Sequence, residues 1–128
     1  MPLPSGGMAT VPTIAVVDDD VSVRHSLGEL LRVADFRALT FGSAEEYLTH
    51  GASEHVDCLI VDVNLPGMNG VALVQALAAR GSRTPAILIT ARDDSVTLDL
   101  IRRAGGIPHL YKPFSDAHLF AAISRALG

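Results

Sequence analysis

The stretch CLIVDV, residues 58–63, is an apolar run of strand length that is interrupted by a single acid, Asp62. A charged side chain inside an apolar strand is costly to bury unless it has a partner. A turn or a helix cap would be the ordinary explanation, but Asn69 is the better cap for the helix expected from Val71. We therefore expect Asp62 to have a functional role.

Strands and helices alternate on both sides of this stretch. The apolar runs predict strands at residues 13–17, 36–41, 58–63, 86–90 and 109–111, and the helical periodicity predicts helices at residues 21–34, 43–50, 71–79, 96–104 and 116–127. Asp20 is expected to cap the first helix, while Ser43 and Glu46 form a capping box in which each side chain binds the other's free amide. This alternation is typical of an α/β fold, a doubly wound parallel sheet with helices on both faces.

The length of 128 residues fits one domain. We expect a flexible N-terminal tail at residues 1–12, which contain three prolines and a Gly-Gly pair, and a folded domain at residues 13–127. The net charge of −4 argues against nucleic-acid binding by this chain, and a single cysteine, Cys58, cannot form an internal disulfide. Neither a membrane-spanning run nor a signal peptide is visible, so we expect no membrane contact and a cytoplasmic location.

Polar side chains stand where the predicted strands end, and parallel strands bring these ends to one ligand-binding edge. They are Asp18, Asp19 and Asp20 after the first strand, Asp62 in the third, Thr90 at the end of the fourth and Lys112 after the fifth. Lys112 is the only lysine beside nine arginines, which suggests that a compact point charge is needed there. Clustered carboxylates need a cation, and oxygen ligands suit Mg²⁺ or Mn²⁺. A carboxylate beside such a metal, a lysine and a hydroxyl can accept a phosphoryl group.

Four motifs, VVDDD, LIVDVNLPGMNG, AILITA and YKPF, resemble in this order the receiver domain of two-component response regulators. The resemblance covers Thr13 to Leu127, and VDDDVSVRHSL and GSAEEYL are similar to the FixJ-like group of transcriptional regulators. It implies a flavodoxin-like fold with a five-stranded sheet of order 2-1-3-4-5 and five helices. It also implies phosphorelay signalling: a sensor histidine kinase or phosphotransfer protein donates a phosphoryl group to Asp62. The chain would be no enzyme beyond self-catalysed phosphotransfer and autodephosphorylation.

The resemblance also assigns the other site residues. Asp18 and Asp19 match the acid pair that holds Mg²⁺ together with Asp62 and the backbone carbonyl of Asn64. Thr90 and Lys112 match the hydroxyl and the lysine that contact the phosphoryl group, and the Lys112–Pro113 bond is expected to be cis. Phosphorylation would then switch the surface made by the helix at residues 96–104, the strand at 109–111 and the helix at 116–127. This surface would control a partner, an output domain or a homodimer.

One position departs from the family pattern, and two others would set the lifetime of the phosphoryl group. His109 stands three residues before the lysine, where family members commonly have the Phe or Tyr of the switch, and Tyr111 shares its face of the strand. Because imidazole titrates near neutral pH, His109 is a hypothetical source of pH-sensitive output. Asn64 and Arg92 match the positions that flank the attacking water, and Arg92 would shield the phosphoryl group and slow its hydrolysis.

Two alternatives remain open from the sequence. The stretch from Asp18 to Ser22 also fits the motif of haloacid dehalogenase-like phosphatases, with Thr90, Lys112 and Asp93-Asp94 as later motifs and Asp18 as the nucleophile. That interpretation leaves Asp62 unexplained. The second alternative is a receiver-like interaction module that is not phosphorylated. The sequence names neither the kinase, the signal nor an output domain.

Overall fold

A computed structural model describes residues 11–128, so the tail expected at residues 1–12 lies almost entirely outside the described residues. Strands and helices alternate as predicted. The strands are β1 (Thr13–Val17), β2 (Arg37–Phe41), β3 (Cys58–Asp62), β4 (Ala86–Thr90) and β5 (His109–Tyr111). The helices are α2 (Val21–Val33), α3 (Ala44–Glu46), which continues into the π-helical turn η1 (Tyr47–Gly51), α4 (Gly70–Ala79), α5 (Ser95–Arg103) and α6 (Asp116–Leu127).

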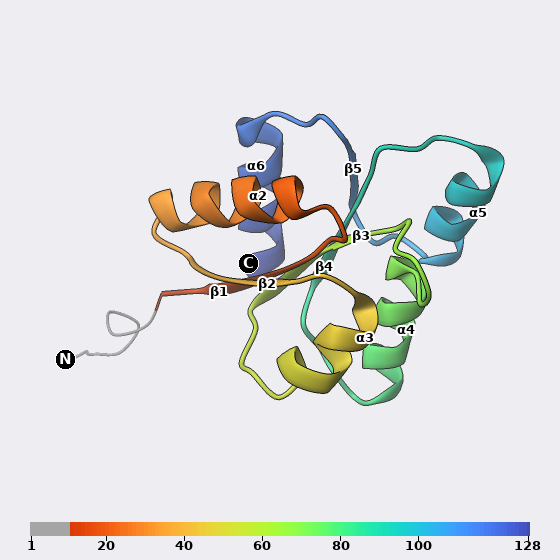
Figure 1. The fold of residues 1–128 in the computed structure, drawn as a ribbon, viewed down its shortest axis with the longest axis horizontal. Helices are drawn as coiled ribbons and strands as arrows, with labels where there is room; N and C mark the ends of the chain where they lie inside the picture. Colours follow the sequence, from red (N-terminus) through yellow and green to blue (C-terminus); the bar gives the residue numbers. More distant parts are fainter. Residues whose placement is uncertain (1–10) are drawn as a thin grey trace.

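The five strands form one parallel sheet in the order β2-β1-β3-β4-β5, which confirms the predicted topology (Figure 1). The register aligns the strand ends, because Val17 pairs with Phe41 and Val61, and Thr90 pairs with Tyr111. All strands therefore deliver the residues that follow them to the same edge, where ligands bind in open α/β sheets.

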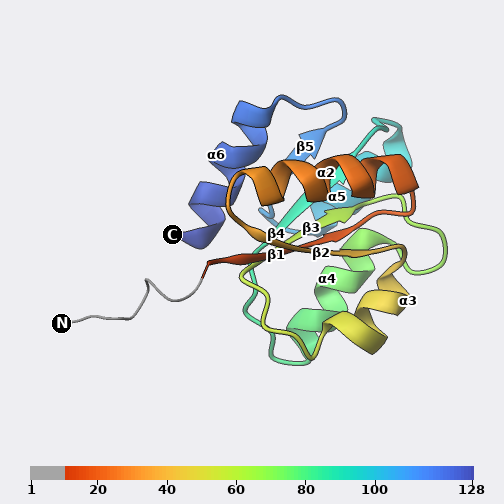
Figure 2. The same cartoon turned by 60° about the vertical axis from the view of Figure 1, so that its left-hand side comes forward.

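Helices cover both faces of the sheet (Figure 2). Successive residues of a strand point to opposite faces, so Ile14 and Val16 pack with α2 and α6, while Ala15 and Val17 pack on the side of α3 and α4. The residues of β1 are buried on both faces, which is why the strand is a continuous apolar run. These two cores hold the sheet rigid beneath the edge at which the predicted site residues stand.

Helix α5 is attached more weakly than its neighbours. Thr97 is its one buried residue, and Leu100, Ile101 and Ala104 after it are only partly buried against the core. By contrast, α6 buries Leu119, Ala122 and Ile123. Because buried apolar surface is the main source of helix attachment, α5 depends unusually on the polar contact of Thr97.

Helix α3 and the turn η1 differ from the helix expected at residues 43–50 in the N-terminal cap and in the C-terminal end. The Ser43 hydroxyl accepts the Glu46 amide at 3.0 Å as predicted, but the Glu46 carboxylate accepts the Gly42 amide at 2.8 Å instead of that of Ser43. The helix then widens, and the Ala52 amide donates to the Tyr47 carbonyl at 2.8 Å. Tyr47 is buried edge-on against Phe41, so tertiary packing shapes this turn. Within residues 11–128, no helix is long and apolar enough to cross a membrane.

Candidate functional site

Asp18 is the first residue after β1 and is completely buried. Its backbone amide donates to the Phe41 carbonyl at 3.1 Å, and its own carbonyl accepts the Arg24 guanidinium at 2.7 Å. The carboxylate accepts the Asp20 amide at 2.9 Å through Oδ1. Asp20 itself caps α2 by accepting the amides of Ser22 and Val23, as the sequence predicts. The backbone therefore fixes Asp18 in one orientation and leaves its Oδ2 free to face the sheet edge.

Asp62 ends β3 and lies beside Asp18, which follows the neighbouring strand β1. Its Oδ1 accepts the Asn64 amide at 2.8 Å. The start of α4 packs so closely on its backbone that a Cβ at Gly70 would lie 2.2 Å from the Asp62 carbonyl oxygen. Only glycine fits at such an approach, which explains the last residue of the LPGMNG motif. Asn69 caps α4 by accepting the Ala72 amide at 2.8 Å, as expected.

Lys112 joins the two carboxylates. Its Nζ donates to Oδ2 of Asp18 at 2.7 Å and to Oδ2 of Asp62 at 2.9 Å, with only 18% of its side chain exposed. Its backbone amide donates to the Thr90 carbonyl at 2.7 Å, and the Lys112–Pro113 bond is cis, as predicted. The β4–β5 pairing thus directs the ammonium between the two acids.

The acid cluster is suited to a small divalent cation. One carboxylate oxygen each from Asp18, Asp19 and Asp62 lies within 4.8 Å of the others, and Asp19 is exposed at the rim while the other two are buried. Oxygen donors of this kind are those that Mg²⁺ prefers, and an exposed side leaves room for water and phosphate ligands. The residues present therefore fit a magnesium ion.

The charges in the cluster act on each other's proton affinity. Burial raises the pKa of the Asp18 carboxyl, and the hydrogen bond from Lys112 offsets only part of that rise. Burial alone would lower the pKa of Lys112, but its hydrogen bonds to Asp18 and Asp62 outweigh it and raise the pKa, so the ammonium stays charged. Three carboxylates face one ammonium, and this excess of negative charge favours a second cation.

Thr90 reaches this cluster through Asn64. The Thr90 hydroxyl donates to Oδ1 of Asn64 at 2.6 Å and accepts the Arg92 amide at 3.0 Å. The Asn64 amide nitrogen donates in turn to the hydroxyl of Thr97 at 3.0 Å. Thr90 and Thr97 are both completely buried. Asn64 therefore touches Asp62, Thr90 and α5 at once.

The structure places two predicted residues farther out. Arg92 forms a 2.9 Å ion pair with Asp94, and 62% of its side chain is exposed. His109 is exposed on β5, and its ring stands edge-on to that of Tyr111 with centroids 5.4 Å apart. Neither ring of this pair fills the position of a buried switch residue.

Two residues at the site escaped the sequence analysis. Thr97 shares a face of α5 with Leu100, Ile101 and Ala104 by helical spacing, and a hydroxyl on an apolar face was the available signal. Arg24 carries no such signal, because its contact with the Asp18 carbonyl depends on how α2 lies against β1.

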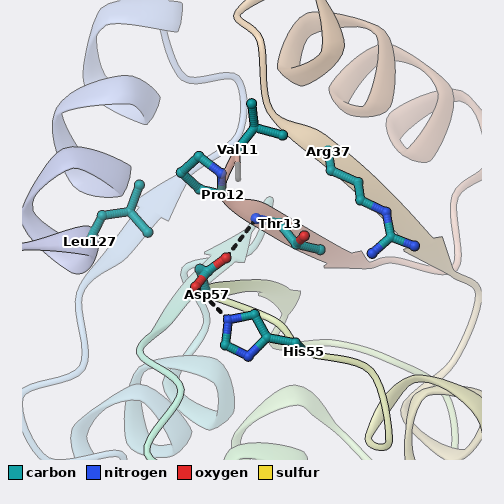
Figure 3. A pocket seen from close by; sticks show the side chains of 7 residues that line it. All are labelled: Val11, Pro12, Thr13, Arg37, His55, Asp57 and Leu127. Atoms are coloured by element: carbon teal, nitrogen blue, oxygen red, sulfur yellow. Dashed lines mark hydrogen bonds and ion pairs between the residues drawn. The ribbon is translucent and has the colours of Figure 1, made fainter. Parts of the chain in front are cut away.

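A hollow of about 560 Å³ lies at the opposite end of the sheet, where β1, β2 and β3 begin (Figure 3). Asp57 accepts the Thr13 amide at 2.8 Å and lies 3.0 Å from His55 (Figure 3). Arg37 lines the other side and pairs with Glu54 at 3.8 Å. The Asp57 carboxylate thus fixes the start of β1, and the hollow is remote from the acid cluster.

The family model that describes the response regulator receiver domain matches residues 14–124. The chain belongs to the receiver domain family. As a receiver domain of response regulators, it acts in two-component signalling. The phosphatase alternative fits the structure less well, because Asp20 and Asp94, two acids of its motifs, cap α2 and α5 instead of facing the cluster.

Named relatives support the FixJ-like grouping of this receiver domain. Nodulation protein W of Bradyrhizobium diazoefficiens is 35% identical over 92% of this chain and 52% of its own length. The transcriptional regulatory protein FixJ of Azorhizobium caulinodans is 34% identical over 90% of this chain and 54% of its own. The crystal structure of FixJ-N superposes with a TM-score of 0.82 at 31% identity, covering 92% of this chain and 94% of that one. The receiver domain spans about half the length of these curated relatives.

Proposed function

We propose that Asp62 is the phosphoacceptor of this receiver domain and that a histidine kinase or phosphotransfer protein supplies the phosphoryl group. The observation that carries the proposal is the position of the Lys112 ammonium, 2.7 Å from Asp18 and 2.9 Å from Asp62. A cation held at this point lies beside the charge that a phosphoryl group on Asp62 would bring.

In the proposed step, a carboxylate oxygen of Asp62 attacks the phosphorus of a phosphohistidine. A phosphorus–oxygen bond forms, the phosphorus–nitrogen bond breaks, and the imidazole leaves with the electron pair of that bond and takes up a proton. The Asn64 amide on Oδ1 and Lys112 on Oδ2 hold the Asp62 carboxylate in position for this attack.

Asp18, Asp19, Asp62 and the Asn64 carbonyl would hold Mg²⁺, with Mn²⁺ as a substitute. When bound, the metal supplies positive charge that stabilises the transferring phosphoryl group. Thr90 would donate its hydroxyl proton to a phosphoryl oxygen, and Lys112 would bind another. The chain would thus promote its own phosphorylation and dephosphorylation without being an enzyme in the usual sense.

The switched surface would be that of α5, β5 and α6. Three apolar side chains on α5 and β5 are exposed there: Val96, Leu98 and Tyr111. Such a surface suits a homodimer or an output domain, and two of the named relatives above match only over about half their length. In a longer protein of this kind, control of transcription is the proposed output. His109 and Tyr111 lie on this surface with their rings edge-on to each other.

The test is phosphorylation by acetyl phosphate with Mg²⁺, followed by intact-protein mass spectrometry. Wild type should gain one phosphoryl group, and Asp62→Asn should gain none. Asp35→Asn is the matched control, because Asp35 is an exposed turn residue at φ 68° where asparagine is tolerated. Labelling that persists in Asp62→Asn would overturn the assignment of Asp62, and an unlabelled wild type would favour the non-phosphorylated module.

A further inference from the structure

Asn64 is bonded at three points. Its backbone amide donates to Asp62, its side-chain oxygen accepts from Thr90 at 2.6 Å, and its side-chain nitrogen donates to Thr97 at 3.0 Å. Asn64 therefore contacts the proposed phosphoacceptor through its backbone and joins Thr90 to α5 through its side chain. Among residues 11–128, no other side chain forms hydrogen bonds to both β4 and α5.

The hydroxyl of Thr90 has one proton to donate. Its contact with the Arg92 carbonyl is 3.3 Å, so the proton belongs to the 2.6 Å bond with Asn64. If the same hydroxyl donates to a phosphoryl oxygen, as proposed above, it can no longer donate to Asn64. The Asn64 oxygen and a phosphoryl group are therefore alternative acceptors for one proton.

Loss of the Thr90–Asn64 hydrogen bond would affect α5, because this helix is weakly attached to the core. Thr97 is the one buried residue of this helix, and its hydroxyl accepts the Asn64 amide nitrogen. An amide that loses its partner on the oxygen side loses the orientation that aims its nitrogen at Thr97. His109 offers no alternative route, because its side chain is exposed and stands edge-on to the ring of Tyr111.

We propose that Asn64 and Thr97 couple phosphorylation of Asp62 to α5. When Thr90 turns to the phosphoryl group, the Asn64–Thr97 bond is released and α5 loosens. Thr97 is thus a positioning residue, because its bond to Asn64 makes the attachment of α5 depend on whether Asp62 is phosphorylated. The inference rests on the proposed function.

Hydrogen–deuterium exchange of the amides in residues 95–104 tests this in the full chain. The added ligand is beryllium trifluoride with Mg²⁺, a non-hydrolysing analogue of the phosphoryl group. In wild type, it should speed exchange about fivefold, the effect of losing one hydrogen bond. Thr97→Val, which keeps the shape without the acceptor, should exchange about fivefold faster from the start and respond less than twofold to the ligand.

Two variants serve as controls. Thr97→Ser keeps the hydroxyl and should respond as wild type does. Thr13→Val makes the same change at a buried residue on the opposite end of the sheet and should also leave the response intact. A wild-type response in Thr97→Val would overturn the proposal.

A second measurement needs no variant. Asn64, Asn69 and Gln75 carry the only side-chain amides in the sequence, so their three NMR signals are readily assigned. Beryllium trifluoride should shift the Asn64 signal and leave that of Gln75 in place. An unmoved Asn64 signal would overturn the coupling. Failure of wild type to accept phosphate from acetyl phosphate would instead overturn the proposed function itself.

Discussion

The ammonium of Lys112 lies 2.7 Å from Oδ2 of Asp18, a carboxylate with no exposed surface. The two residues are separated by 94 positions in the sequence. Without this lysine, Asp18 would be a buried acid beside a second acid, Asp62. The pair therefore links the chemistry of the site to the stability of the fold.

Lys112→Met should destabilise the metal-free protein by about 3 kcal/mol, because removing one partner of a buried ion pair leaves the other charge uncompensated. Mg²⁺ should restore more stability to this variant than to wild type, since it supplies the missing positive charge. Urea unfolding with and without Mg²⁺ measures both effects. Arg103→Met breaks the exposed pair with Asp99 and should cost less than about 1 kcal/mol. Equal costs for the two variants would contradict a buried role for Lys112.

Mg²⁺ should stabilise wild type by about 1.4 kcal/mol when present at ten times its dissociation constant, because it binds the folded acid cluster and not the unfolded chain. Thermal unfolding at matched ionic strength measures this, and EDTA should reverse it. Asp19→Asn removes the rim carboxylate and should abolish most of the gain, whereas Asp35→Asn should leave it unchanged. The site would not be the magnesium site if Asp19→Asn kept the full gain.

Arg92→Ala should shorten the half-life of the phosphoryl group by up to about fivefold, the range of an exposed charge contact. Arg92 pairs with Asp94 here, and its long side chain would turn to shield the phosphoryl group. Decay of the labelled protein, followed by mass spectrometry, gives the half-life. The half-life in Arg92→Lys, which keeps the charge, should fall between those of wild type and Arg92→Ala. An unchanged half-life in Arg92→Ala would remove this role.

Glu45 should contribute to stability above its ordinary pKa of 4.5 and lose that contribution at lower pH. The Met68 amide donates to its carboxylate at 2.9 Å and lowers the pKa, so the folded state favours the ionised form. As the pH falls below 4.5, the unfolded chain takes up this proton before the folded protein does, so the free energy of unfolding decreases. The gap in unfolding free energy between wild type and Glu45→Gln should be widest near pH 6 and close toward pH 3. A gap that stays constant over this range would contradict the prediction.

Cys58 should not react with thiol reagents at pH 8 in the folded protein. Burial raises the pKa of its thiol to about 12, so almost none of the reactive thiolate exists, and the side chain is completely buried. In urea the single cysteine should react fully. Rapid reaction of the native protein would show that β3 opens readily.

The sequence alone determined the architecture and the identity of the site residues that the geometry brings together. Apolar runs set the strands β1, β3 and β4, and caps such as Asp20 and Asn69 set helix starts, because both signals act over a few neighbouring positions. A parallel sheet then obliges Asp18, Asp62 and Lys112 to meet at one edge, since each follows or ends a strand.

Tertiary structure alone decided which side chains bond across that edge. The Asn64–Thr97 contact spans 33 positions. Arg24 reaches the Asp18 carbonyl only because α2 lies along β1. Such bonds depend on distances of a few tenths of an ångström that packing and strand register set together, and no local pattern in the chain encodes them.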